Sequence, residues 1–107
     1  MKGFVKLTII SSMLLTGLIF AREKADVQVD LDRFFSKIVI DGDNLFSHTA
    51  EGDDDMPAHI RTALTQTNLS IPIRNHQLLL GQWQGIFIFE HRFNSFKRKV
   101  HIHLIGE

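Results

Sequence analysis

Acidic residues and histidines cluster between positions 48 and 59 in a pattern that could bind a metal ion or a phosphate. The run Glu51-Gly52-Asp53-Asp54-Asp55-Met56-Pro57-Ala58-His59 follows His48 closely, so twelve positions hold four acids and two histidines. Carboxylates and imidazoles are common ligands of divalent metals, and a helix start offers free amide hydrogens to anions. On a helix, Asp55 and His59 would share one face, where the carboxylate could orient the imidazole as a base. A helix N-cap beside a solvent-exposed histidine explains the same residues without chemistry.

A second group surrounds the single tryptophan, in the run Gly81-Gln82-Trp83-Gln84-Gly85. A tryptophan between glycines is typical of a ligand-binding wall, because glycine lets a ligand approach the backbone. The same pattern is also typical of a core tryptophan at a strand bulge.

A third group lies near the end of the sequence and consists of Glu90, His91, His101 and His103. His101 and His103 share one face of a strand, as two metal ligands would. The alternative is that these side chains are merely polar partners across neighbouring strands.

The elements that position these groups follow from hydrophobic spacing. Apolar residues at helical intervals predict a helix over residues 26–38 that buries one face. A second helix is expected from Asp55 to about Gln66, with Asp54 or Asp55 as its cap. Period-two segments then predict strands over 69–73, 78–80, 86–93 and 100–105. The fold class is therefore α+β, a mainly antiparallel or mixed β-sheet sandwich with two or three helices.

The first 21 residues are hydrophobic and allow two interpretations. Lys2 and Lys6 precede an uncharged stretch that ends at Ala21, which is typical of an export signal. Val5 and Ile9 belong instead to a β-prone pattern, so the segment could form one or two buried strands.

Composition limits the function classes. The 107 residues carry 12 basic and 12 acidic side chains, which argues against a generally basic nucleic-acid binder. The absence of cysteine excludes disulfide scaffolds and thiolate zinc sites. The chain also has no P-loop, dinucleotide-binding fingerprint, HExxH or GxSxG motif, so no common motif-bearing enzyme class gains support. One small domain is expected from the length.

Several of these motifs occur together, in the same order and spacing, in a known family. The stretch 51–59, the run Gly81-Gln82-Trp83-Gln84-Gly85-Ile86, Glu90-His91-Arg92 and Ile105-Gly106-Glu107 all match it. The segment Asp30-Leu31-Asp32-Arg33-Phe34-Phe35 is also similar to the preceding helix of that family. From about residue 23 to residue 107, the chain resembles the YjbQ-like family, also described as secondary thiamine-phosphate synthase enzymes.

The resemblance implies a homotrimer with a polar pocket near subunit boundaries and a weak thiamine-phosphate synthase activity, which joins a pyrimidine diphosphate to a thiazole phosphate. It implies Asp55 and His59 as the catalytic pair. The alternatives to an enzyme are a non-catalytic module that binds a metal or a phosphate ligand, and a decayed, truncated remnant. The pocket lining that it implies is Glu23, Glu51, Gly52, Trp83, Gln84 and Gly85. The cofactor stays open; a divalent metal is considered, with His48, Asp55 and His59 as candidate ligands. A small phosphorylated ligand is the expected partner, and the expected location is the cytoplasm.

The N-terminal region departs from the pattern of the family. Members have additional strands there, followed by a His-Thr-Ser/Thr segment and Asn-Glu. Glu23 matches that Glu, but Arg22 stands in place of Asn and no histidine precedes His48. The sequence thus predicts an N-terminally incomplete domain over residues 22–107 with impaired activity, a truncated or frame-disrupted member. The alternatives are a protein exported or membrane-associated through residues 1–21, and a segment 3–19 that replaces the missing strands.

Overall fold

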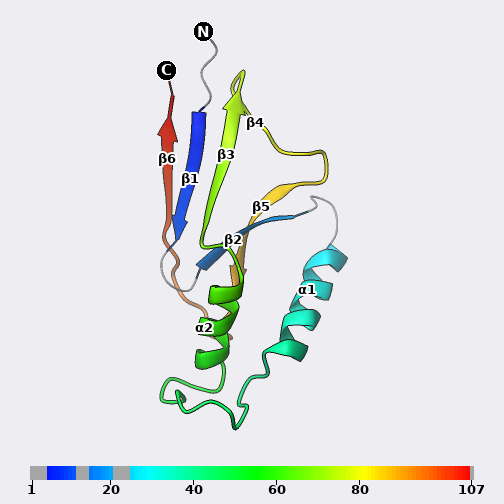
Figure 1. The fold of residues 1–107 in the computed structure, drawn as a ribbon, viewed down its shortest axis with the longest axis vertical. Helices are drawn as coiled ribbons and strands as arrows, with labels where there is room; N and C mark the ends of the chain where they lie inside the picture. Colours follow the sequence, from blue (N-terminus) through cyan, green and yellow to red (C-terminus); the bar gives the residue numbers. More distant parts are fainter. Residues whose placement is uncertain (1–4, 12–14, 21–24, 107) are drawn as a thin grey trace.

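The structure is a computed structural model that describes residues 5–11, 15–20 and 25–106, with side chains from Val27 onward. The described residues form two antiparallel sheets and two helices, joined by loops, which confirms the α+β class (Figure 1). The elements are β1 (Val5–Ser11), β2 (Leu15–Phe20), α1 (Ala25–Ile38), α2 (Asp55–Leu64), β3 (Asn68–Arg74), β4 (Gln77–Leu78), β5 (Gly85–Glu90) and β6 (Val100–Ile105).

The hydrophobic N-terminal segment supplies one strand to each sheet. In the four-stranded sheet the order is β4-β3-β1-β6, so β1 lies between β3 and β6. Lys6 pairs with Pro72 on one side and with Ile105 on the other. In the second sheet β2 pairs with β5, from Leu15 opposite Glu90 to Phe20 opposite Gly85. In the structure this segment therefore forms two β-strands, as the second interpretation predicts.

Both helices form where the sequence predicts them. Helix α1 covers the predicted range, but α2 ends at Leu64, two residues before the predicted end. The reason is that Thr65 is already extended, with φ −119° and ψ 167°, and its hydroxyl donates a hydrogen bond to the carbonyl oxygen of Arg61 at 2.7 Å. The carbonyl groups of the last helical turn need hydrogen-bond donors, and a side-chain hydroxyl can replace the backbone amide that a further turn would supply.

Three strand predictions need correction. The predicted strand 86–93 ends at Glu90, and the strand 78–80 is reduced to Leu78. Gly81 and Gln84 lie in a turn and not in a bulge. The amide of Gln84 donates to the carbonyl of Gly81 at 3.0 Å, and the Gln84 side chain accepts from the Gly81 amide at 2.7 Å. These two local bonds close the loop without a partner strand.

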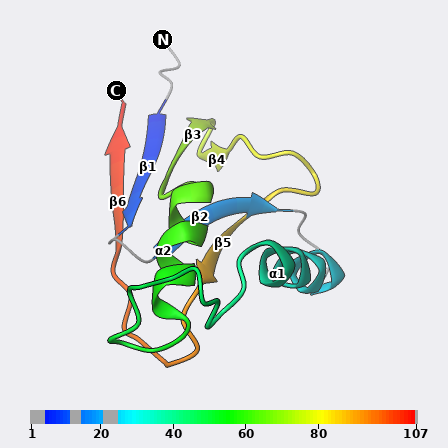
Figure 2. The same cartoon turned by 60° about the horizontal axis from the view of Figure 1, so that its bottom comes forward.

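The core of the described residues is small. Leu69 and Ile71 of β3 are buried, and Ile73, Leu80 and Ile86 pack against them. The face of α1 that was predicted to be buried is only partly covered, since Phe34 and Ile38 stay about half exposed. In Figures 1 and 2, α1 lies to one side of the sheets; its Phe35 ring contacts the Phe89 ring at a centroid distance of 5.7 Å.

Within the described ranges, no helix combines the length and the apolar character needed to cross a membrane.

Candidate functional site

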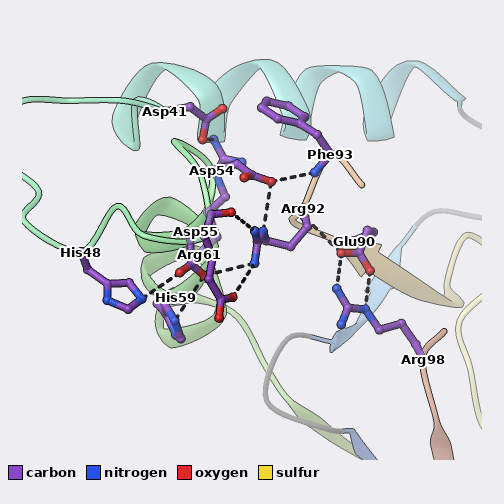
Figure 3. A network of polar contacts seen from close by, with 11 residues as sticks. Asp41, His48, Asp54, Asp55, His59, Arg61, Glu90, Arg92, Phe93 and Arg98 are labelled. Atoms are coloured by element: carbon purple, nitrogen blue, oxygen red, sulfur yellow. Dashed lines mark hydrogen bonds and ion pairs between the residues drawn. The ribbon is translucent and has the colours of Figure 1, made fainter. Parts of the chain in front are cut away.

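Arg92 is the centre of a buried polar network that joins the end of β5 to the start of α2 (Figure 3). Its Nε donates to Asp54 Oδ2 at 3.0 Å, and one terminal nitrogen donates to Asp55 Oδ1 at 3.1 Å. The other terminal nitrogen donates to the backbone carbonyl of Glu51 at 2.9 Å. The planar guanidinium thus binds two carboxylates and a loop carbonyl at once, which a lysine could not do.

Asp54 occupies the N-cap position of α2, but its carboxylate makes no capping hydrogen bond. Oδ2 instead accepts from Arg92 and, at 2.8 Å, from the backbone amide of Phe93. Burial raises the pKa of Asp54, while the Phe93 hydrogen bond, the Arg92 hydrogen bond and the Arg92 charge lower it; the net pKa lies below its ordinary value. The predicted cap is therefore an anchor for the residues that follow β5.

Asp55 lies between Arg92 and two histidines. Its side chain is only 3% exposed, and its Oδ2 lies 2.8 Å from Nε2 of His48. On the Arg92 side, Oδ1 is also 3.6 Å from Nε2 of His59. The two imidazole rings contact each other edge to face at 5.4 Å between centroids. The predicted pairing of Asp55 with His59 is close in space, and His48 joins it.

The two histidines are accessible to solvent: the His48 side chain is 52% exposed and the His59 side chain is 37% exposed. Within the described residues, Oδ2 of Asp55 accepts no aligned hydrogen bond even though His48 is near. A buried carboxylate oxygen with no aligned donor is rare in native structures. The site is thus a buried carboxyl group with two solvent-accessible imidazoles beside it.

The loop before α2 holds this arrangement in place through unusual backbone geometry. Gly52 has φ +117°, a conformation that side chains rarely adopt, and its carbonyl accepts from the amide of Asp55 at 3.2 Å. A Cβ atom at Gly52 would lie 3.2 Å from Asp54 Oδ1. Arg61 of α2 holds the first part of this loop in position, because its guanidinium donates a hydrogen bond to the carbonyl oxygen of Val39 at 2.9 Å.

The other predicted lining residues do not all lie here. Glu51 is close, with its exposed carboxylate 3.8 Å from an Arg92 nitrogen. Glu23 lies outside the described residues. Trp83 is half exposed in the loop between β4 and β5, which in Figure 1 is far from the start of α2. Gln84 and Gly85 line a separate open hollow of about 900 Å³.

The third predicted group does not gather into a metal site. Among the residues that the structure describes, three metal-ligating side chains come together only at His48, Asp55 and His59. Glu90 binds Arg98 through two hydrogen bonds, at 2.6 and 2.5 Å, and His103 is exposed on β6.

His91 of the third group is buried against the Phe89 ring at 4.5 Å between centroids. Burial, aided by the charge of Arg61, lowers the pKa of His91 to about 4. The ring is therefore neutral at physiological pH and acts as a core side chain.

Sequence patterns predict no separate role for Arg92, which lies at the centre of the network in the structure. The partners of Arg92 lie 37 to 41 positions earlier in the chain. The sequence feature that indicates Arg92 is the run Glu90-His91-Arg92, which is one of the motifs that resemble the YjbQ-like family.

Comparisons with known proteins agree with this architecture. The model of the family described as UPF0047 protein YjbQ-like matches residues 2–107. UPF0047 protein sll1880 of Synechocystis sp. is 50% identical over 82 residues, which are 77% of this chain and 56% of that protein. UPF0047 protein YjbQ of Salmonella typhimurium is 42% identical over 81 residues, which are 76% of this chain and 58% of that protein. The chain thus spans little more than half the length of these relatives.

Solved structures share the fold at lower identity. A YbjQ-like protein of unknown function from Sulfolobus solfataricus superposes with a TM-score of 0.85 at 19% identity, covering 99% of this chain and 75% of that one. A protein of the yjbq/upf0047 family from Clostridium acetobutylicum gives 0.80 at 24% identity, covering 98% and 78%. These similarities support the fold alone.

Proposed function

Because the chain belongs to the YjbQ-like UPF0047 family, we propose that its Asp55 site binds a small phosphorylated molecule and supports a weak thiamine-phosphate synthase activity. One observation carries the proposal: a buried carboxylate lies between a buried arginine and two solvent-accessible imidazoles. An imidazole oriented by a carboxylate can hold or transfer a proton near neutral pH.

The proposed reaction joins two phosphorylated heterocycles. The thiazole nitrogen forms a bond to the methylene carbon of the pyrimidine diphosphate while the bond from that carbon to the diphosphate oxygen breaks, and diphosphate leaves. In this proposal Nε2 of His59 faces Asp55, and the other ring nitrogen, Nδ1, donates a hydrogen bond or a proton to the departing oxygen. Arg92 does not fill this role, because its side chain is 4% exposed and its donors already bind protein oxygens. Arg92 is a positioning residue.

A product assay with both phosphorylated substrates tests the proposal. We expect Asp55→Asn and His59→Gln to reduce product formation at least tenfold, since general acid–base groups contribute about 10²–10⁴-fold. The matched control is His103→Gln, which removes an exposed histidine on β6, far along the chain from the site. Full activity in both site variants would contradict the assignment. Ligand binding by calorimetry without any product would make the site a binding module.

We also propose that the chain forms a homotrimer, as the resemblance implies. Strand β6 ends the four-stranded sheet, and its Ile102, Leu104 and Ile105 are each more than half exposed. Exposed apolar edge strands favour association. Sedimentation equilibrium should give a trimer mass, and Ile102→Lys should lower it. A monomer mass for the unaltered chain at micromolar concentration would contradict the proposal.

A cytoplasmic location is also a proposal, taken from the resemblance. Cleavage after Ala21 would remove β1 and leave β3 and β6 without the strand that lies between them. Because unpaired strand edges promote aggregation, we expect the folded protein to keep these residues. Mass spectrometry of the protein from its native cells would detect cleavage.

A further inference from the structure

We propose that His48, Asp55 and His59 bind a divalent transition-metal ion through two imidazole nitrogens and one carboxylate. The proposal rests on the same site as the proposed function and adds to it the class of ion that the site takes. It does not require turnover.

The distances are close to those of a metal site. One ligand atom from each of the three residues lies within 4.8 Å of the other two. Nitrogen and oxygen ligands lie about 2.0–2.2 Å from a metal such as zinc, so neighbouring ligand atoms are roughly 3–4 Å apart. Nε2 of His59 is 3.6 Å from Asp55 Oδ1, and Nε2 of His48 is 2.8 Å from Oδ2. A small movement of the two exposed imidazoles would complete the geometry.

The state of Asp55 is the second observation. Its side chain is 97% buried, yet Oδ2 accepts no aligned hydrogen bond from the described residues. Desolvation of a carboxylate oxygen is unfavourable unless a donor or a cation compensates it. This oxygen faces the imidazoles (Figure 3). A cation between the three side chains would satisfy it.

Arg92 supplies the outer support that such sites have. It donates to Oδ1 at 3.1 Å and so fixes the plane of the carboxylate from the side opposite His48. Hydrogen bonds to a ligating carboxylate orient it and tune metal affinity.

The ligand types select the metal. Two imidazoles and one carboxylate suit Zn²⁺, Fe²⁺, Mn²⁺ or Co²⁺, whereas Mg²⁺ and Ca²⁺ prefer sets of oxygen ligands. Three protein ligands also leave at least one coordination position open. A phosphate oxygen could occupy that position, which links the ion to the proposed ligand class.

Metal titration of the full chain tests the inference. After removal of metals with a chelator, Co²⁺ is added and followed by its visible absorption, and Zn²⁺ is added in a calorimeter. We expect one ion per chain, with Mg²⁺ at least 100-fold weaker than Zn²⁺. His48→Gln and His59→Gln should each weaken Zn²⁺ binding at least tenfold, while His103→Gln should leave it unchanged. His48 is half exposed, so its variant should fold, which circular dichroism would check.

Two outcomes would overturn the inference: no saturable Zn²⁺ binding by the folded chain, or equal binding by the His48, His59 and His103 variants. The product assay separates this failure from that of the proposed function. Product formation that needs His59, in a folded chain that shows no saturable Zn²⁺ binding, would refute the metal and keep the function. Stoichiometric metal binding without any product would refute the function and keep the metal.

Discussion

Replacing Arg92 with methionine should destabilise the fold more than any surface substitution. Methionine has a similar length but no charge, so Arg92→Met removes the hydrogen bonds to Asp54 and Asp55 and leaves both carboxylates buried. Removing one partner of a buried ion pair typically reduces stability by about 3–5 kcal/mol. Because small domains are stable by only about 5–15 kcal/mol, this loss would be a large share of the total.

The effect is measured as the change in the free energy of unfolding from urea titrations followed by circular dichroism. Protein concentration is held constant, since association would shift apparent stability. Arg33→Met is the matched control, because Arg33 makes a comparable 3.1 Å ion pair with Asp30 on the surface, with a side chain that is 64% exposed. Exposed pairs of this kind contribute about 0–1 kcal/mol.

A double variant tests the cause. If uncompensated buried charge explains the loss, adding Asp54→Asn to Arg92→Met should recover part of the stability, so the two changes will not be additive. The reasoning would be refuted if Arg92→Met lost no more stability than Arg33→Met. Strict additivity of Arg92→Met and Asp54→Asn would refute the assigned cause.

Two further predictions concern pH and backbone conformation. The pKa of His91 is about 4 in the folded chain and about 6.5 in the unfolded chain. Between these pH values the unfolded chain therefore binds more protons than the folded chain. The free energy of unfolding should fall by up to roughly 3 kcal/mol as the pH drops from 6.5 to 4. Urea titrations across this range should show that slope, and His91→Gln should flatten it; an unchanged slope would contradict the assignment. Gly52→Ala should lower stability by about 1–3 kcal/mol, because φ +117° is strained for alanine. Thermal unfolding would measure this, and an unchanged melting temperature would count against it.

Local spacing predicted the parts of the fold that depend on neighbours in the sequence. The range of α1 and the start of α2 follow from helical periodicity, and Asp55 lies one turn from His59 as expected. The ends of α2 and β5 were wrong because local side-chain contacts decide them, such as the Thr65 hydroxyl on the Arg61 carbonyl.

The rest of the site depends on contacts between distant segments. The Asp54–Arg92 hydrogen bond joins residues 38 positions apart, and no periodicity encodes such a pair. Asp54 shows the consequence: its residue type and place predicted a helix cap, but a long-range partner takes its carboxylate. His91 was grouped with metal ligands by composition, whereas burial beside Phe89 makes it a core residue.

The position of β1 between β3 and β6 affects how the chain folds while it is being synthesised. Ser11 at the end of β1 pairs with Val100 at the start of β6, a separation of 89 positions. At about 5–20 residues per second, a ribosome needs roughly 5–20 s to make the intervening chain. During that interval β1 has both hydrogen-bonding edges open until β3 and then β6 emerge. A nascent chain with open edges is a substrate for chaperones that hold extended hydrophobic segments, so yield in the cell should depend on translation speed and chaperone supply as well as on final stability.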